Sequence, residues 1–262
     1  MFELLIAAAV CGLGLRTLQG VFVTVGGRPS LPKVDLGSVR VWILLCLAAI
    51  LIFKPTYGSA LVVALMLHEL GHVAAHRILG HADVRFRLAP LFADAAISKT
   101  ATRTQAQAFF VTIMGAGFSL VPMVATLVGA HLLKDAAPGA SGLLYALGST
   151  IAALNFVNLL PLLPLDGGRC LRQILATLCP VTGGYILLTL SAGAAALAFA
   201  QESLSLIVIV CLGGLIFFRP LEDGLHRAGM TRKTALLALA IYAFTLAAHA
   251  VAGWWLIRWY FW

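Results

Sequence analysis

Long apolar stretches recur along the whole chain and constrain its fold more than any other feature. Those long enough to cross a bilayer, or nearly so, are 41–57, 59–79, 106–133, 142–165, 183–200, 203–218 and 234–257. Only 11% of the 262 residues are charged, against about 25% in soluble domains. The stretch 2–15 has no Lys or Arg before its apolar run, which favours a short span or a membrane-lying segment over a signal peptide. We therefore predict an all-α polytopic membrane protein with about seven or eight membrane segments.

The net charge of +8 follows a membrane topology rather than a nucleic-acid surface. If the loop 80–105 faces the cytoplasm and the spans alternate from there, the inner segments are 16–40, 77–105, 166–182 and 219–233. These segments hold 15 of the 18 Lys and Arg residues. An inward excess of these residues is the orientation rule for membrane proteins. We expect a multi-pass protein of the cytoplasmic (inner) cell membrane, surrounded by the lipid bilayer and without a nucleic-acid partner.

A motif of ionisable residues, HELGH, interrupts the apolar stretch 59–79. On a helix, His68 and His72 are stacked on one face, so that both imidazoles can bind one metal ion. Glu69 lies about 100° around the helix from His68, beside such a metal, where it can reach a water molecule. The alternative is that the histidines bond to neighbouring helices and that Glu69 pairs with an arginine. Ionisable groups at membrane depth are costly to bury, which favours the functional interpretation.

A hydrolytic zinc site needs three protein ligands, and Asp166 is the preferred third. Asp166 lies at the end of the apolar run LLPLLPLDGG. The spans 59–79, 106–133 and 142–165 are three consecutive crossings, so the first and the third both end at the cytoplasmic face. Topology alone therefore places Asp166 on the same side of the membrane as the histidines. Asp166 and the histidines can meet only if the helix stops near residue 160 and the following chain stays inside the bundle. His76 competes, one turn further along the same face. Three histidines on consecutive turns of one helix do not easily converge on a single ion.

HELGH followed after three crossings by NLLPLLPLDGG resembles the site-2 protease family of intramembrane zinc metalloproteases (M50 type), particularly the compact bacterial sporulation-factor-processing proteases. The resemblance implies one Zn²⁺ per chain, bound by His68, His72 and Asp166, with Glu69 as general base. It also implies that Asn158 holds the substrate or its developing oxyanion. The implied activity is hydrolysis of peptide bonds within or next to transmembrane segments, with the active site toward the cytoplasm. The implied partners are a transmembrane protein or peptide as substrate and a regulatory membrane protein.

The resemblance divides the chain into three parts. N-terminal membrane segments occupy 1–58, a metalloprotease core occupies 59–182, and C-terminal transmembrane helices occupy 183–262. Within the core we expect the HELGH helix, a strand and loop region at 80–105, a helix at 106–133 and the LDG segment at 142–170. The alternation in DVRFRLAPLF predicts a small membrane-associated β element beside the three-helix core.

Two other interpretations stay open. A metal-ion transporter would use the His and Asp residues as a transit site, but polar residues leading to the outer face are sparse. Tyr145, Ser149, Thr150 and Asn155 are the main ones. Prenyl-protein endoproteases also carry H-E-x-x-H in membranes, but they need a downstream glutamate on another helix. The later glutamates here, Glu202 and Glu222, flank spans in polar loops.

Overall fold

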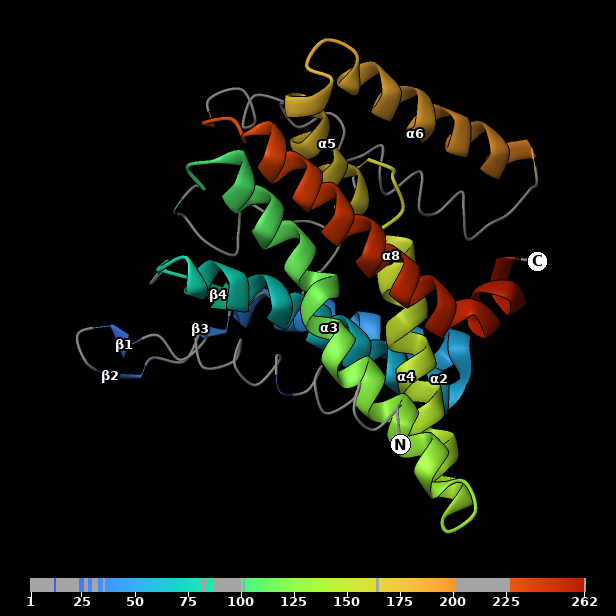
Figure 1. Cartoon of the computed structure of the whole chain (residues 1–262). Helices are drawn as coiled ribbons and strands as arrows, with labels where there is room; N and C mark the ends of the chain where they lie inside the picture. The colour runs from blue at the N-terminus through green and yellow to red at the C-terminus, as the bar shows by residue number, and fades with distance from the viewer. Residues whose placement is uncertain are drawn as a thin grey trace. The chain divides into compact units, whose positions relative to one another are not determined.

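The structure, a computed structural model, describes residues 12, 24–25, 28–29, 33–34, 36–81, 83–86, 100, 102–163, 165–200 and 227–261. Its helices are α2 (Leu36–Ile78), α3 (Gln105–Leu133), α4 (Pro138–Asn158), α5 (Asp166–Leu178), α6 (Gly183–Ala200) and α8 (Arg232–Phe261), labelled in Figure 1. Strands of two residues each precede or follow α2: β1 (Thr24–Val25), β2 (Arg28–Pro29), β3 (Lys33–Val34) and β4 (Arg85–Phe86).

Four helical segments are long and apolar enough to cross a membrane: Cys46–Ile78, Gln105–Leu133, Pro138–Asn158 and Arg232–Arg258. Gly183–Ala194 is a shorter apolar helix. The predicted segment 203–218 and nearly all of 2–15 lie outside the described residues. The helical character of the chain is therefore confirmed, and the total of seven or eight segments stays a prediction.

The chain packs as two units. The first comprises Met1–Thr100, Met114–Phe156 and Ala247–Trp262, and the second comprises Ala101–Ile113 and Val157–Leu246. Each is described below by itself.

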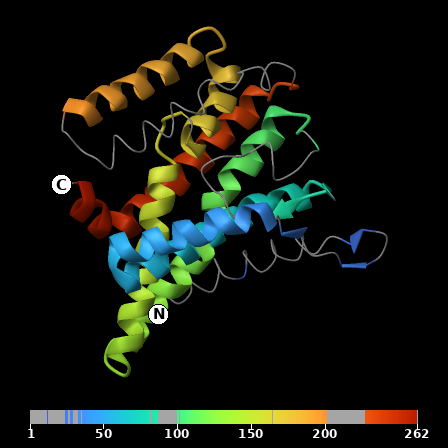
Figure 2. The same cartoon turned by 180° about the vertical axis from the view of Figure 1, so that it is seen from behind.

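In the first unit, α2 is two helices joined by a sharp break. Lys54 has φ 65° and ψ 160°, and the next residue is Pro55, which disfavours the helical conformation of the residue before it. An uninterrupted helix of 43 residues would be about 65 Å long, with its ends far apart. Instead β3, just before α2, pairs with β4, just after it. Figure 1 and Figure 2 show α2 turning back on itself, and a Cβ at Gly58 would lie 2.6 Å from the Ala49 carbonyl oxygen.

The same unit has a core in which α2, α3 and α4 meet. Ala64, Met123, Ile151 and Ala152 form a buried cluster with one or two members from each helix. Small residues let helices approach closely where lipid supplies no hydrophobic drive between them. At Gly71 of α2, a Cβ would collide with the Met114 carbonyl of α3. The backbones of α2 and α3 therefore approach closely within the HELGH motif.

The β element is small in the described residues. β3 and β4 pair in parallel over two residues, Lys33 with Arg85 and Val34 with Phe86. Residues 87–99, which hold the rest of the predicted strand and loop region, lie outside the described residues. A β element that could receive a substrate backbone remains a prediction.

The predicted span 142–165 ends early. The helix α4 stops at Asn158, and a turn that includes residues 159–163, in the second unit, leads into α5. Pro161 explains the end, because proline cannot donate the helical hydrogen bond and its ring clashes with the preceding turn. Side chains from later helices bond to this turn. The Tyr242 hydroxyl donates to the Leu159 carbonyl (2.7 Å), and the Leu163 amide donates to Ser191 Oγ (3.0 Å).

Candidate metal centre

The HELGH motif presents a pair of buried histidines on one face of α2. His68, Glu69 and His72 are 4%, 8% and 6% exposed. The Nε2 atoms of His68 and His72 are 3.0 Å apart, and the two rings meet edge to face. Two imidazole nitrogens bound to one tetrahedral zinc ion, at about 2.0–2.1 Å each, are about 3.3 Å apart. The helix therefore holds the two nitrogens close to the spacing that one ion requires.

Asn155 of α4 fixes the orientation of His68. Its Oδ1 accepts a hydrogen bond from His68 Nδ1 at 2.8 Å, while its Nδ2 donates to the Ile151 carbonyl at 2.8 Å. The second bond settles which way the amide points. Because Nδ1 then carries the ring proton, Nε2 of His68 is the acceptor nitrogen, and it faces His72 Nε2. Such an outer partner is the usual way to set the tautomer of a metal-binding histidine.

We expect Asn155→Leu to lower the zinc affinity of the protein about 10–100-fold, because His68 loses the acceptor that fixes its tautomer. Competition with a chromophoric zinc chelator measures this affinity. Asn158→Leu is the matched control, since it removes the same group one turn further along α4. It should leave zinc affinity unchanged. Equal zinc affinities for Asn155→Leu and wild type would exclude this role for Asn155.

Gly115 of α3 makes room for the two imidazoles. A Cβ there would lie 2.6 Å from His72 Nε2 and 2.7 Å from His68 Cε1. Gly117, two residues later, is different, because a Cβ there would meet only the Met114 sulfur at 3.7 Å, an ordinary contact. The structure therefore distinguishes the two glycines. Only Gly115 borders the nitrogens that would bind a metal.

Asp166 begins α5 and is 8% exposed. A helix N-terminus favours a carboxylate, and Arg169 Nη1 bonds to its Oδ1 at 3.3 Å. The two glycines that follow explain the LDGG sequence. A Cβ at Gly167 would collide with the Leu159 and Leu160 carbonyls, and one at Gly168 would collide with the Leu162 carbonyl. Residues 159–163 of the turn thus lie directly on the first turn of α5, which begins with the aspartate.

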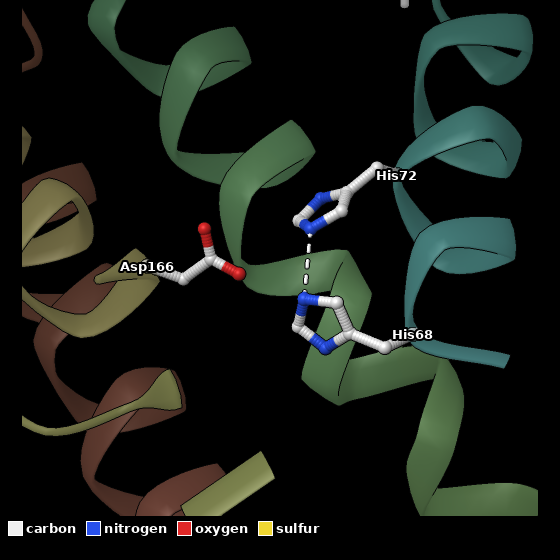
Figure 3. Close-up of side chains that lie close together, drawn as sticks. All are labelled: His68, His72 and Asp166. Atoms are coloured by element: carbon white, nitrogen blue, oxygen red, sulfur yellow. Dashed lines mark hydrogen bonds between the residues drawn. The ribbon is translucent and has the colours of Figure 1, made fainter. Parts of the chain in front are cut away.

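The ligand atoms of His68, His72 and Asp166 all lie within 4.8 Å of one another. Figure 3 shows the three side chains pointing toward one another, the two histidines from α2 and the aspartate from the start of α5. Among the described residues, this is the group of three that meets the geometric requirement for a metal ion. Two nitrogens and one carboxylate are a ligand set typical of catalytic zinc, which leaves the fourth position open.

His76, the competing ligand, has a different neighbour. Its Nδ1 lies 2.9 Å from Nδ1 of His81, just beyond the end of α2. It is absent from the group of three ligand atoms found in the described part of the chain. Asp166 is the residue whose ligand atom lies near those of His68 and His72, and its role as third ligand stays a prediction.

Comparison with known proteins shows to which protein family the chain belongs. The profile of peptidase family M50 matches residues 89–197, which include Gly115, Asn155 and Asp166. A Synechocystis sp. (strain ATCC 27184 / PCC 6803 / Kazusa) protein named "Putative zinc metalloprotease" is 33% identical over 210 residues, covering 78% of this chain. The chain is of the M50 peptidase type. It spans about half, 52%, of the length of that relative. No solved structure matches the chain at a significant level.

The residues of the HELGH and LDGG motifs account for part of the site. Two further contributors, Asn155 and Gly115, were not predicted from the sequence. Asn155 was noted only as a sparse polar residue, although a buried amide in an apolar helix is itself a functional indication. Gly115 lies two residues before Gly117 in an apolar stretch, and nothing in the sequence distinguishes the two glycines. Asn158, the predicted oxyanion residue, is the last residue of α4 and is half-buried. Its role stays a prediction.

Proposed function

We propose that this M50-type chain is an intramembrane zinc metalloprotease that hydrolyses peptide bonds within or next to transmembrane segments of other membrane proteins. The observation that supports it most is the pair of Nε2 atoms 3.0 Å apart on a helix apolar enough to span a membrane. Asn155 fixes the tautomer of His68 in which Nε2 can bind a metal ion, and Asp166 supplies a carboxylate as the third ligand. One Zn²⁺ per chain, held by His68, His72 and Asp166, fits this ligand set.

Zinc bound there supplies a Lewis acid, which polarises a carbonyl oxygen and lowers the pKa of a water molecule towards about 7. Glu69, the residue after His68, does the proton transfer. Its carboxylate accepts a proton from the attacking water and delivers it to the leaving nitrogen. Burial of Glu69 excludes bulk water, which strengthens its interaction with the developing charges.

The substrate must present an unwound peptide bond, because a helical one is shielded by its own hydrogen bonds and side chains. Pairing with the 83–98 region would supply an extended conformation by β-augmentation. Asn158 would donate a hydrogen bond from its side-chain amide to the oxyanion as it forms. In this account, removal of Asn158 lowers turnover and leaves metal binding intact.

Water reaches the site along the non-helical turn before Asp166. Backbone that is not helical at membrane depth is tolerated where it is buried in protein or lines a wet cavity. Residues 159–163 belong to such a segment, and Tyr242 and Ser191 satisfy two of its backbone groups. The Leu160 and Leu162 amides bond to nearby backbone carbonyls, and the other polar groups of the segment would hydrogen-bond to the water that hydrolysis consumes.

The remaining proposals concern location and partners. The protein would be a multi-pass component of the cytoplasmic cell membrane, with its active site toward the cytoplasm, as the Lys and Arg distribution predicts. Its partners would be a transmembrane protein or peptide as substrate, the surrounding lipid and a regulatory membrane protein.

The test is cleavage of a single-span reporter peptide by the purified protein in proteoliposomes. We expect products whose new termini, located by mass spectrometry, lie within or next to the span, and we expect 1,10-phenanthroline to prevent their formation. A zinc-sensitive dye inside the vesicles distinguishes the transporter alternative. Zinc entry without reporter cleavage would overturn the proposed function.

A further inference from the structure

The last helix, α8, presents one buried face along its length. Its buried residues recur every three or four positions, which is the spacing of a single helix face: Ala235, Ala238, Tyr242, Thr245, His249, Gly253 and Leu256. Other positions, such as Leu237, Phe244 and Val251, are exposed apolar residues suited to lipid. The helix lies beyond residue 197, where the family match ends. Tyr242 and His249 are the buried members whose side chains bond to other helices or turns.

His249 bonds to α3 beside the metal histidines. It is fully buried, and its Nε2 lies 3.0 Å from the Ala116 carbonyl oxygen. A carbonyl only accepts, so Nε2 carries the proton and donates. Within the described residues, Nδ1 is buried without a hydrogen bond, which agrees with this tautomer. Because Ala116 lies inside a continuous helix, its carbonyl already has a helical partner, and the bond from His249 serves to locate α3.

The position of α3 at this point matters because Ala116 follows Gly115. Gly115 is the residue whose Cβ would touch His68 and His72 at 2.7 and 2.6 Å. Further along α8, a Cβ at Gly253 would lie 2.8 Å from the Ala153 nitrogen of α4, two residues before Asn155. This end of α8 therefore contacts both helices that border His68.

Tyr242 makes the corresponding bond in the second unit. It lies seven residues before His249 and hence on the same face of α8. Its hydroxyl donates to the Leu159 carbonyl, which follows the end of α4 and therefore has no helical partner. The same carbonyl lies directly against Gly167, the residue after Asp166. Tyr242 thus holds the turn that precedes Asp166.

We propose that α8 is a positioning element of the metal centre, in which His249 holds α3 against the two metal histidines and Tyr242 holds the turn that carries the metal aspartate. Neither residue is a metal ligand or a catalytic residue. The inference rests on the proposed metal centre. It assigns α8 a structural role at that centre in addition to its packing in the membrane.

The test compares His249→Leu, His249→Gln and Tyr242→Phe with wild type in full-length protein in detergent. We expect His249→Leu and Tyr242→Phe each to lower zinc affinity about 10–100-fold and to change the visible spectrum of bound Co²⁺, as loss of an outer positioning group does. His249→Gln should stay close to wild type, because its amide can still donate to Ala116. Thr245→Val is the matched control, since Thr245 is buried on the same face but bonds only within α8, to Ile241.

A second measurement needs no metal. In the metal-stripped protein, diethyl pyrocarbonate modification of His68 and His72, located by mass spectrometry, should be faster in His249→Leu than in wild type and unchanged in Thr245→Val. Zinc affinity, Co²⁺ spectrum and modification rates equal to wild type in His249→Leu would overturn the inference. A wild-type protein that binds no zinc would instead count against the proposed function, and the modification rates would still decide the role of α8.

Discussion

Replacing Glu69 with glutamine is expected to leave one zinc per chain in place and to reduce reporter cleavage to a small residual rate. Glutamine keeps the size of the side chain but cannot accept the proton of the attacking water. General acid–base catalysis contributes about 10²–10⁴-fold to a rate, and that is the expected loss. The initial rate of reporter cleavage in proteoliposomes, measured beside the zinc content of the same preparation, gives both quantities.

Asp135→Asn is the matched control. Asp135 is an exposed acid between α3 and α4 and does not belong to the group His68, His72 and Asp166. It should cleave at the wild-type rate. Wild-type activity of Glu69→Gln would remove the general base from the mechanism. Loss of zinc from Glu69→Gln would make Glu69 a ligand and require a different site.

The second large effect is expected at a residue without a side chain. Gly115→Ala introduces a methyl group 2.6 Å from His72 Nε2, closer than real contacts of this kind, and the nearest atoms belong to the two metal histidines. The rings must move apart, or α3 must move away from α2. We expect the purified variant to contain little zinc and to be inactive.

Gly117→Ala is the control on the same helix, because its Cβ would meet an ordinary contact at 3.7 Å. Alanine is about 1 kcal/mol more favourable than glycine inside a helix, so neither variant should lose helix content by circular dichroism. A Gly115→Ala protein with a full complement of zinc would show that α3 does not border the metal position.

The predicted membrane helices and the HELGH face follow from hydrophobic length and helical period. The structure confirms a helical chain with four helices long and apolar enough to cross a membrane in its described part, and the function of the HELGH face stays a prediction. Asp166 was predicted from topology and from the shortage of other acids, and the geometry of the ligand atoms is consistent with that choice. The end of α4 near residue 160 was also expected, because Pro161 and Pro164 follow Asn158. These features depend on local sequence or on the number of crossings.

The features that the sequence did not predict depend on how helices dock against one another. Asn155, Gly115 and His249 acquire their roles from neighbours 43 to 133 positions away, as in the bond between Asn155 and His68, 87 positions apart. An asparagine in an apolar helix predicts some partner but not which one. The pairing of His76 with His81 similarly requires the turn that ends α2.

The most direct test of the account is the zinc content of the purified protein, measured for wild type, His68→Ala, Asp166→Ala and Glu69→Gln. The account predicts one zinc per chain in wild type and in Glu69→Gln, and none in His68→Ala or Asp166→Ala. A protein that keeps its zinc after Asp166→Ala would contradict the ligand set, and with it the mechanism built on that site.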